Sequence, residues 1–505
     1  MSSTKAVRLL LISGAALSLI VLAVALLIQR TTPSLSLWHT VSLDAEFRAE
    51  DAANGFSWAQ YLELESRLFA ELDEKIVQPS ENDANPLWNR YAADGANNPE
   101  TFPENWNRSY ELSLPSPRGG ALLIHGLTDS PYSLRTTAEI LHRHGLHIVG
   151  LRLPGHGTTP LALRQAEVDD WRAAVRIAYE HLIHEINGGP ILLVGYSNGG
   201  ALALDLTLDC IDADELPTPD HIVLYSPAIG ITRAAALARI SRLLNWMPWF
   251  DKLGWGSVEP ELDPFKYSSF PNDAGYLTHL LTTSVRSRLA EIEDHDDAVR
   301  FPPVLTFMSL ADATVMVERV VDGLHDRLVD NDSELVIFDI NRGAKMRDFF
   351  KTDPAERLRT LTSRDSTPYR LTALTNHDPS TDTLEEWSRP ARSTTPSIRT
   401  LDLAWPAGFY SLSHLALPFP QDDPVYGFSP DPEQAFGIQL GALEPRGERG
   451  LLSIHPGQFN RLRSNPFFPY IEQRLVDLAM SAHIPSDTGR TTVSRATTTL
   501  ETPVP

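Results

Sequence analysis

The chain has 505 residues, 42% of them hydrophobic, and a formal net charge of −22 at pH 7. This length suffices for one large domain or two ordinary ones with a sizeable core. The acidic balance excludes nucleic acid and anionic lipid headgroups as electrostatic partners, although it leaves the insertion of apolar surface into lipid open.

The N-terminal segment is predicted to anchor the protein in a membrane. Residues 9–28 carry no charge, and as a helix they would extend about 30 Å, the thickness of the hydrocarbon core of a bilayer. Lys5 and Arg8 precede this run. The positive-inside rule therefore predicts a cytoplasmic N-terminus and a transmembrane anchor within residues 1–30, with the catalytic part exported to the periplasm or the cell exterior. The alternative is a signal peptide cleaved after Ala25, which the apolar residues that follow disfavour.

Residues 31–107 are predicted to form a spacer and a helical extension. Ser57 and Gln60 fit a capping box at the start of a helix that runs to Ile76, with apolar side chains at helical spacing. We expect this helix to pack on the main domain or to act as a spacer above the membrane. Residues 79–107 are rich in Asn, Pro and Trp and are expected to be irregular.

Short apolar runs then alternate with segments of helical periodicity. This alternation predicts a parallel sheet with helices on both faces. The strands are expected at 109–114, 120–127, 147–153, 191–194 and 221–227.

Three of these strands end in motifs that resemble those of a known family. The motifs are His-Gly-Leu at 125–127, Pro-Gly-His-Gly at 154–157 and Gly-Tyr-Ser-Asn-Gly at 195–199. The last is a G-x-S-x-G sequence between a strand and a helix, which projects a serine hydroxyl from the edge of a sheet. In this order the motifs resemble the α/β-hydrolase family, and specifically its monoacylglycerol-lipase and serine-aminopeptidase-like branch, over roughly residues 108–230.

The resemblance implies an α/β-hydrolase fold, with a mostly parallel central sheet flanked by helices, over residues 108–480. It also implies an inserted cap over the active site at about 228–300. That segment is rich in aromatic residues and broken by prolines. We expect most of the aromatics to form the core of the cap, and a few within 246–255 to line an acyl pocket or to touch lipid.

The remaining elements follow the cap. Strands are predicted at 304–310, 334–340 and 401–405, with a helix at 317–328 after the first of them. Residues 342–398 are polar and are expected to form an irregular insertion. Residues 481–505 are expected to be a disordered tail, because they are rich in Thr and Pro and have little to bury.

Nucleophilic catalysis by serine needs a base and an acid that orients it, and in this fold the order along the chain is Ser, acid, His. Ser197, at the centre of the elbow, is the predicted nucleophile. Asp312 is the predicted acid, because it directly follows a strand and resembles the strand-end Asp of the family; the alternative role for it is to cap the next helix. His414 is the predicted base, in a loop that resembles the family's late histidine loop. His377, inside the insertion, is the alternative base.

Other candidates are disfavoured by their positions. Asp322 and Asp326 fall on a helix and Asp339 within a strand. His125 and His156 belong to loops that are structural in the family, so they are interpreted as residues that fix those loops.

The oxyanion of the reaction needs two donors. The backbone N–H of Asn198 is predicted to supply one, and the resemblance implies that Leu127 supplies the other. No metal or organic cofactor is needed, and no Cys/His cluster has the spacing of a zinc site. Cys210, the only cysteine, is predicted to be a small buried hydrophobe, and its position excludes a lipoprotein anchor.

Together these features predict a membrane-anchored, exported serine hydrolase that cleaves carboxylic esters through an acyl-enzyme. A lysolipid, a monoacylglycerol or a medium-chain acyl ester would suit an anchor beside lipid. A peptidase or thioesterase with the same triad remains an alternative, and so does a non-catalytic hydrolase-like scaffold at the membrane.

Overall fold

The computed structural model describes a set of ranges along the chain together with a few positions before residue 27; the ranges are 27–53, 55–80, 89–229, 248–293, 300–343, 354–432, 437–443 and 461–481. Within these residues no helix is both long and apolar enough to cross a membrane. Most of the predicted anchor at 9–28 lies outside them, as does the predicted tail apart from Ser481.

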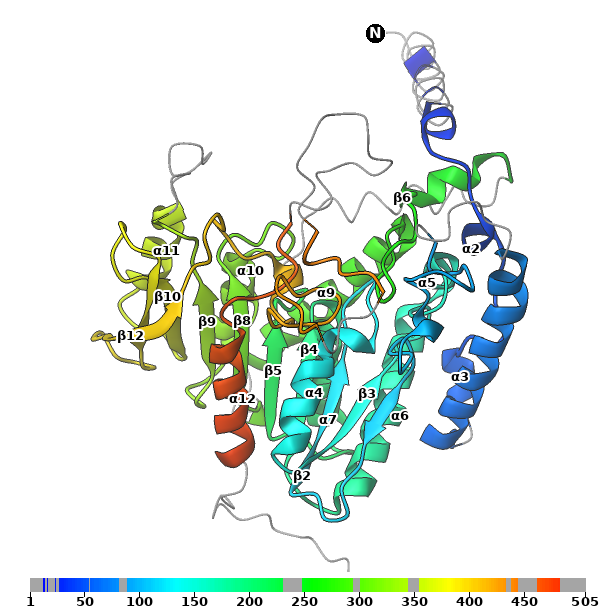
Figure 1. The fold of residues 1–505 in the computed structure, drawn as a ribbon. Coiled ribbons are helices and arrows are strands. Elements are labelled where there is room, and N and C mark those ends of the chain that lie inside the picture. The colour runs from blue at the N-terminus through cyan, green and yellow to red at the C-terminus, as the bar shows by residue number, and fades with distance from the viewer. Residues whose placement is uncertain are drawn as a thin grey trace, which may run out of the picture.

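A ten-stranded sheet forms the centre of the fold (Figure 1), in the order β1-β3-β2-β4-β5-β8-β9-β10-β11-β12. The strands from β3 to β10 in this order pair in parallel, whereas β1, β11 and β12 pair antiparallel. The mostly parallel sheet predicted from the alternating pattern is therefore confirmed. The bounds are β1 Tyr110–Leu112, β2 Gly119–Ile124, β3 Leu146–Leu151, β4 Ile191–Tyr196, β5 His221–Tyr225, β8 Val304–Ser309, β9 Glu334–Phe338, β10 Arg370–Asn376, β11 Thr383–Arg389 and β12 Ser397–Ala404.

Helices cover both faces of this sheet. In β2, Leu122 and Ile124 belong to the core on the side of α6 and α7, whereas Ala121 and Leu123 belong to the core on the side of α4 and α12. Because side chains alternate along a strand, a strand buried on both faces is apolar throughout, as β2 and β4 are. The helices around the sheet are α4 Arg135–Arg143, α5 Pro160–Gln165, α6 Val168–Ile186, α7 Asn198–Ala213, α9 Asn272–Glu293, α10 Val317–Gly323, α11 Pro354–Thr362 and α12 Phe468–Ser481.

The helix predicted to begin at Ser57 is confirmed as α3, Trp58–Leu72, after the short α2, Leu37–Thr40. Ser57 and Gln60 form the expected capping box, and the helical path continues to Ser80 through a π-turn and a 3₁₀ turn. α3 packs on the hydrolase core, because Tyr61 is buried there and donates a hydrogen bond to the carbonyl of Arg152 at 2.7 Å. The extension is thus part of the folded body.

A buried ion cluster joins the extension to the sheet. Arg152 follows β3 and is 1% exposed. Its guanidinium lies 2.9 Å from the carboxylate of Glu65 on α3 and 3.0 Å from that of Glu46. It also donates to the carbonyl of His156 at 3.0 Å, so one side chain links the extension, β3 and the loop after it.

Replacing Arg152 with Met should therefore lower the stability strongly. The change leaves two buried carboxylates without a counter-ion, and breaking a buried pair in this way costs about 3–5 kcal/mol. The free energy of unfolding in urea measures the effect. Arg176→Met is the matched control, because Arg176 pairs with Glu180 on a partly exposed surface, where such pairs contribute about 0–1 kcal/mol. Equal losses in the two variants would contradict the assigned role of Arg152.

The structure differs from the expectation of an irregular segment at 342–398. Its described part contains α11, β10, β11 and the start of β12, and these strands extend the main sheet at the end opposite α3 (Figure 1). β10 is largely buried beside β9, whereas β11 and β12 are antiparallel and partly exposed. Antiparallel strands with a solvated face carry polar residues, so this stretch has the composition of a loop.

The predicted cap segment divides between the core and a separate small sheet. Trp255–Ser257 and Phe270–Pro271 form the two-stranded sheet β6-β7, which the sequence did not predict. α9 instead packs into the main core, where Leu277, Leu281 and Val285 are buried beside α6 and α7. Residues 230–247 lie outside the described part, so the bounds of the cap stay a prediction.

Candidate active site

The predicted nucleophile lies on a sharp turn between β4 and α7. Ser197 has φ +52° and ψ −113°, and it is partly exposed between buried neighbours. A Cβ on Gly195 would lie 2.5 Å from the Cα of Gly200, and one on Gly199 would lie 2.0 Å from the carbonyl of Ile124. Both glycines are required by this close packing of strand and helix, so the local sequence forces the serine into a strained conformation at the edge of the sheet.

The His-Gly loop after β2 lies against this turn. A Cβ on Gly126 would be 3.3 Å from the Cβ of Ser197. The N–H of Leu153 donates to Nε2 of His125 at 3.0 Å, so Nδ1 carries the proton and donates to the carbonyl of Gly126 at 2.9 Å. Burial lowers the pKa of His125 well below its ordinary value. The neutral ring therefore joins the ends of β2 and β3, in agreement with its interpretation as a loop-fixing residue.

Two backbone groups near Ser197 are the predicted oxyanion donors. Asn198 is the first residue of α7, and the first N–H groups of a helix have no acceptor within it. Leu127 directly follows Gly126, in the loop packed on Ser197. Both backbone N–H groups therefore lie near the nucleophile, as the predicted oxyanion donors must, and their role as donors stays a prediction.

Residues of the segment before β7 hold the loop that carries Leu127 in place. The N–H of Tyr267 donates to the carbonyl of Thr128 at 2.8 Å, and the ammonium of Lys266 donates to the carboxylate of Asp129 at 2.7 Å. Thr128 has φ +62°, so this turn is strained and needs such support. No local pattern predicts the contact between Lys266 and Asp129, which are 137 positions apart.

The predicted acid Asp312 lies just beyond the carboxyl end of β8 and is 3% exposed. Its Oδ1 accepts hydrogen bonds from the backbone N–H groups of Thr314 and Val315, at 2.8 and 2.9 Å. Burial raises its pKa, but the contact with His414 and these N–H groups outweigh burial, so the pKa of Asp312 lies below its ordinary value. The carboxylate is ionised at neutral pH.

The predicted base His414 lies at the start of a 3₁₀ turn, His414–Ala416, with Nδ1 3.3 Å from Oδ1 of Asp312. Two contacts place its loop beside the elbow. The hydroxyl of Tyr196 donates to the carbonyl of His414 at 3.4 Å, and that of Ser309 donates to the carbonyl of Leu412 at 2.8 Å. The tertiary fold therefore brings Asp312 and His414 together at the same edge of the sheet as Ser197.

The alternative candidates have other partners. His377 is exposed and its Nδ1 lies 2.9 Å from the carboxylate of Glu385. Asp339 directly follows β9, where it pairs with Arg342, and Asp326 pairs with Arg364. Asp322 lies on α10. In the described structure the carboxylate that contacts His414 is that of Asp312.

Arg461 is a further residue at this site that the sequence did not reveal. Its guanidinium lies 3.3 Å from Nδ1 of His414. A guanidinium only donates hydrogen bonds, so Nδ1 cannot accept from Arg461 while it donates to Asp312. The two contacts are therefore alternatives, and the tautomer that leaves Nε2 free to accept a proton is the one paired with Asp312.

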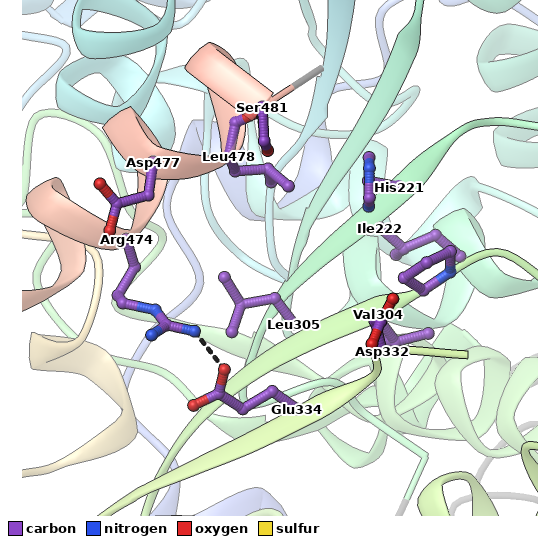
Figure 2. Close-up of a pocket in the computed structure, with 11 residues that line it drawn as sticks. His221, Ile222, Val304, Leu305, Asp332, Glu334, Arg474, Asp477, Leu478 and Ser481 are labelled. Atoms are coloured by element: carbon purple, nitrogen blue, oxygen red, sulfur yellow. Dashed lines mark hydrogen bonds and ion pairs between the residues drawn. The ribbon is translucent and has the colours of Figure 1, made fainter. Parts of the chain in front are cut away.

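The cavity drawn in Figure 2 lies away from this site. It has a volume of about 290 Å³ and is lined by residues at the amino ends of β5, β8 and β9 together with α12. Arg474 contacts Glu334 across it. Ser197 and Asp312 follow the carboxyl ends of their strands, so this cavity lies at the opposite edge of the sheet.

Comparisons with known proteins match the part of the chain that contains the elbow. Residues 115–339 match the family described as serine aminopeptidase, S33. A thermostable monoacylglycerol lipase of Bacillus sp. (strain H-257) is 26% identical over 231 residues, which are 43% of this chain and 87% of that protein. A solved monoacylglycerol lipase of Paleococcus ferrophilus is 19% identical, with a TM-score of 0.36, over 46% of this chain and 88% of its own. A soluble variant of monoglyceride lipase from Saccharomyces cerevisiae is 15% identical, with a TM-score of 0.34, over 45% and 81%.

The chain is therefore a serine hydrolase of the esterase and lipase type. More closely, its residues 115–339 are similar to the branch of α/β-hydrolases that holds monoacylglycerol lipases and serine-aminopeptidase-like proteins.

Proposed function

We propose that Ser197, Asp312 and His414 form a catalytic triad that hydrolyses carboxylic esters. The observation that supports this most directly is the 3.3 Å contact between Nδ1 of His414 and the buried Asp312, in a loop fixed beside the nucleophile elbow. Asp312 holds the imidazole with Nδ1 protonated. Nε2 then accepts the proton of the Ser197 hydroxyl as its oxygen attacks the ester carbonyl.

The attack forms a tetrahedral oxyanion, which the N–H groups of Leu127 and Asn198 stabilise. When it collapses, the ester C–O bond breaks and the imidazolium returns its proton to the leaving alcohol. Water then attacks the acyl-Ser197 ester with His414 as base again, so that the carboxylic acid leaves and the serine hydroxyl is restored.

We propose that the substrate is a lysolipid, a monoacylglycerol or a medium-chain acyl ester. The Bacillus relative, whose name states that it is a monoacylglycerol lipase, supports an acyl glycerol. Peptide or thioester cleavage by the same triad is the second candidate, because the matched family is described as a serine aminopeptidase.

A fluorophosphonate probe and a panel of p-nitrophenyl esters test these proposals together. We expect the probe to label Ser197 and the rate to rise as the acyl chain lengthens from acetate to medium-chain esters. An aminoacyl-anilide and an acyl thioester in the same panel test the second candidate. No labelling and no turnover would instead favour a non-catalytic scaffold.

We further propose that residues 9–28 anchor the protein in a membrane, with the catalytic part exported. The uncharged run and the preceding Lys5 and Arg8 support this placement. The protein should stay in the membrane fraction during a high-salt wash, because salt screens charges but does not weaken the burial of an apolar helix in lipid. Its catalytic part should be cleaved by protease only from the exported side.

Removing residues 1–30 should release a soluble, active hydrolase, because every residue of the proposed triad lies further along the chain. N-terminal sequencing of the membrane-bound protein is the decisive control. A mature chain that begins at Leu26 would replace the anchored placement with a secreted one.

A further inference from the structure

Two imidazoles and a carboxylate meet on one face of the sheet, far from Ser197. Nε2 of His147 lies 2.8 Å from Oε1 of Glu111, and Nε2 of His181 lies 3.1 Å from Oε2 of the same carboxylate. The ligating atoms of all three side chains lie within 4.8 Å of one another.

The fold builds this cluster from three elements. Glu111 is on β1 and His147 on the neighbouring strand β3, where Glu111 pairs with Val149. His147 is two residues from Val149, so it points to the same face as Glu111. α6 covers that face and brings His181 over the pair, with the ring of His181 stacked on Trp58 of α3 at a centroid distance of 5.7 Å.

One nitrogen of the cluster has no hydrogen bond. His147 is 3% exposed, and within the described part of the chain its buried Nε2 has no hydrogen-bond partner, since Glu111 approaches it outside hydrogen-bond geometry. A buried polar atom without a partner is costly. A cation between His147 and Glu111 would satisfy this atom.

We propose that Glu111, His147 and His181 bind a divalent transition-metal ion of the zinc class. Imidazole nitrogens and a carboxylate are donors that zinc takes, at about 2.0–2.2 Å. One nitrogen from each imidazole and one oxygen of Glu111 supply three donor atoms, and a water molecule can take the fourth position. Tetrahedral bonds of about 2.1 Å separate ligand atoms by about 3.4 Å, so the two nitrogen–oxygen distances, 2.8 and 3.1 Å, need to lengthen by only a few tenths of an ångström.

The ion would act as a structural link. His147 is level with Ile191, because both pair with Gly120 of β2. Ser197 is six positions beyond Ile191, which corresponds to about 20 Å along a strand. Bound metal would therefore tie the edge strand β1 to β3 and α6 without touching the proposed triad.

Zinc titration of the full chain, purified in a mild detergent and stripped with EDTA, tests this site. We expect one Zn²⁺ per chain after gel filtration, a higher Tm with Zn²⁺ than with EDTA, and an unchanged rate of ester hydrolysis. Co²⁺ should bind in its place and give visible d–d absorption bands.

Two ligand variants and one matched control complete the test. His181→Gln and Glu111→Gln keep the shape of partly exposed side chains, and each should weaken Zn²⁺ binding at least tenfold and abolish the Co²⁺ bands. His184→Gln is the control, because His184 lies one turn along α6 and its side chain is 86% exposed. This variant should bind Zn²⁺ as the unmodified chain does. Circular dichroism of the metal-free variants separates loss of the ligand from loss of the fold. The absence of stoichiometric zinc in the unmodified chain would overturn the proposal. It would also be overturned if both ligand variants retained zinc, or if His184→Gln lost zinc as much as the ligand variants do.

Discussion

Ser197→Ala is expected to lower kcat for ester hydrolysis by about 10⁴–10⁶-fold, because the acyl-enzyme cannot form and only the oxyanion donors and substrate binding still act. The fold should persist. Alanine keeps the Cβ that serine already has at φ +52°, so the strain of the turn does not change. The rate with p-nitrophenyl esters and the circular dichroism spectrum measure the two effects.

Ser226→Ala is the matched control for this change. Ser226 directly follows the neighbouring strand β5 and also has a positive φ, of 40°. The control removes one hydroxyl from a similar turn and should leave most of the activity. Near-normal turnover by Ser197→Ala would contradict the whole enzymatic interpretation.

Asp312→Asn and His414→Ala should each lower kcat by about 10³–10⁵-fold. Without His414 nothing accepts the serine proton. The amide of an asparagine at position 312 can donate to Nδ1, which favours the wrong tautomer of the imidazole. Because the three residues act as a unit, Ser197→Ala combined with His414→Ala should be no slower than Ser197→Ala alone.

His377→Ala is the control for the base, because His377 is the other candidate and pairs with Glu385. This variant should keep its activity. A loss in His377→Ala together with normal turnover in His414→Ala would show that the base is assigned wrongly, while the class of enzyme would stand.

The sequence alone could predict the parts of the fold and site that depend on local pattern. The apolar runs at β2 and β4 identify strands buried on both faces, and the glycines around Ser197 identify a tight turn between a strand and a helix. The capping box at Ser57 gave the start of α3 correctly. These features lie within a few consecutive residues, where spacing and residue type are sufficient evidence.

Prediction from the hydrophobic pattern was wrong where polar residues form regular secondary structure. β11 and β12 lie at the end of the sheet with solvated faces, so their sequences resemble a loop. The pairing of β10 with β9 and β11 shows that residues 370–404 continue the main sheet.

Contacts between distant segments were decided by the tertiary structure. A strand-end Asp312 and a late His414 could be proposed from their order in the chain, but their 3.3 Å contact depends on the loop being held at β4 and β8. No local signal reveals that Arg152 lies between Glu46 and Glu65, or that Arg461 reaches His414. The sequence determined which residues could do chemistry on this sheet. Which of them meet was set by strand order and helix packing, because a side chain's partners are fixed by the elements packed against it and not by its neighbours in the chain.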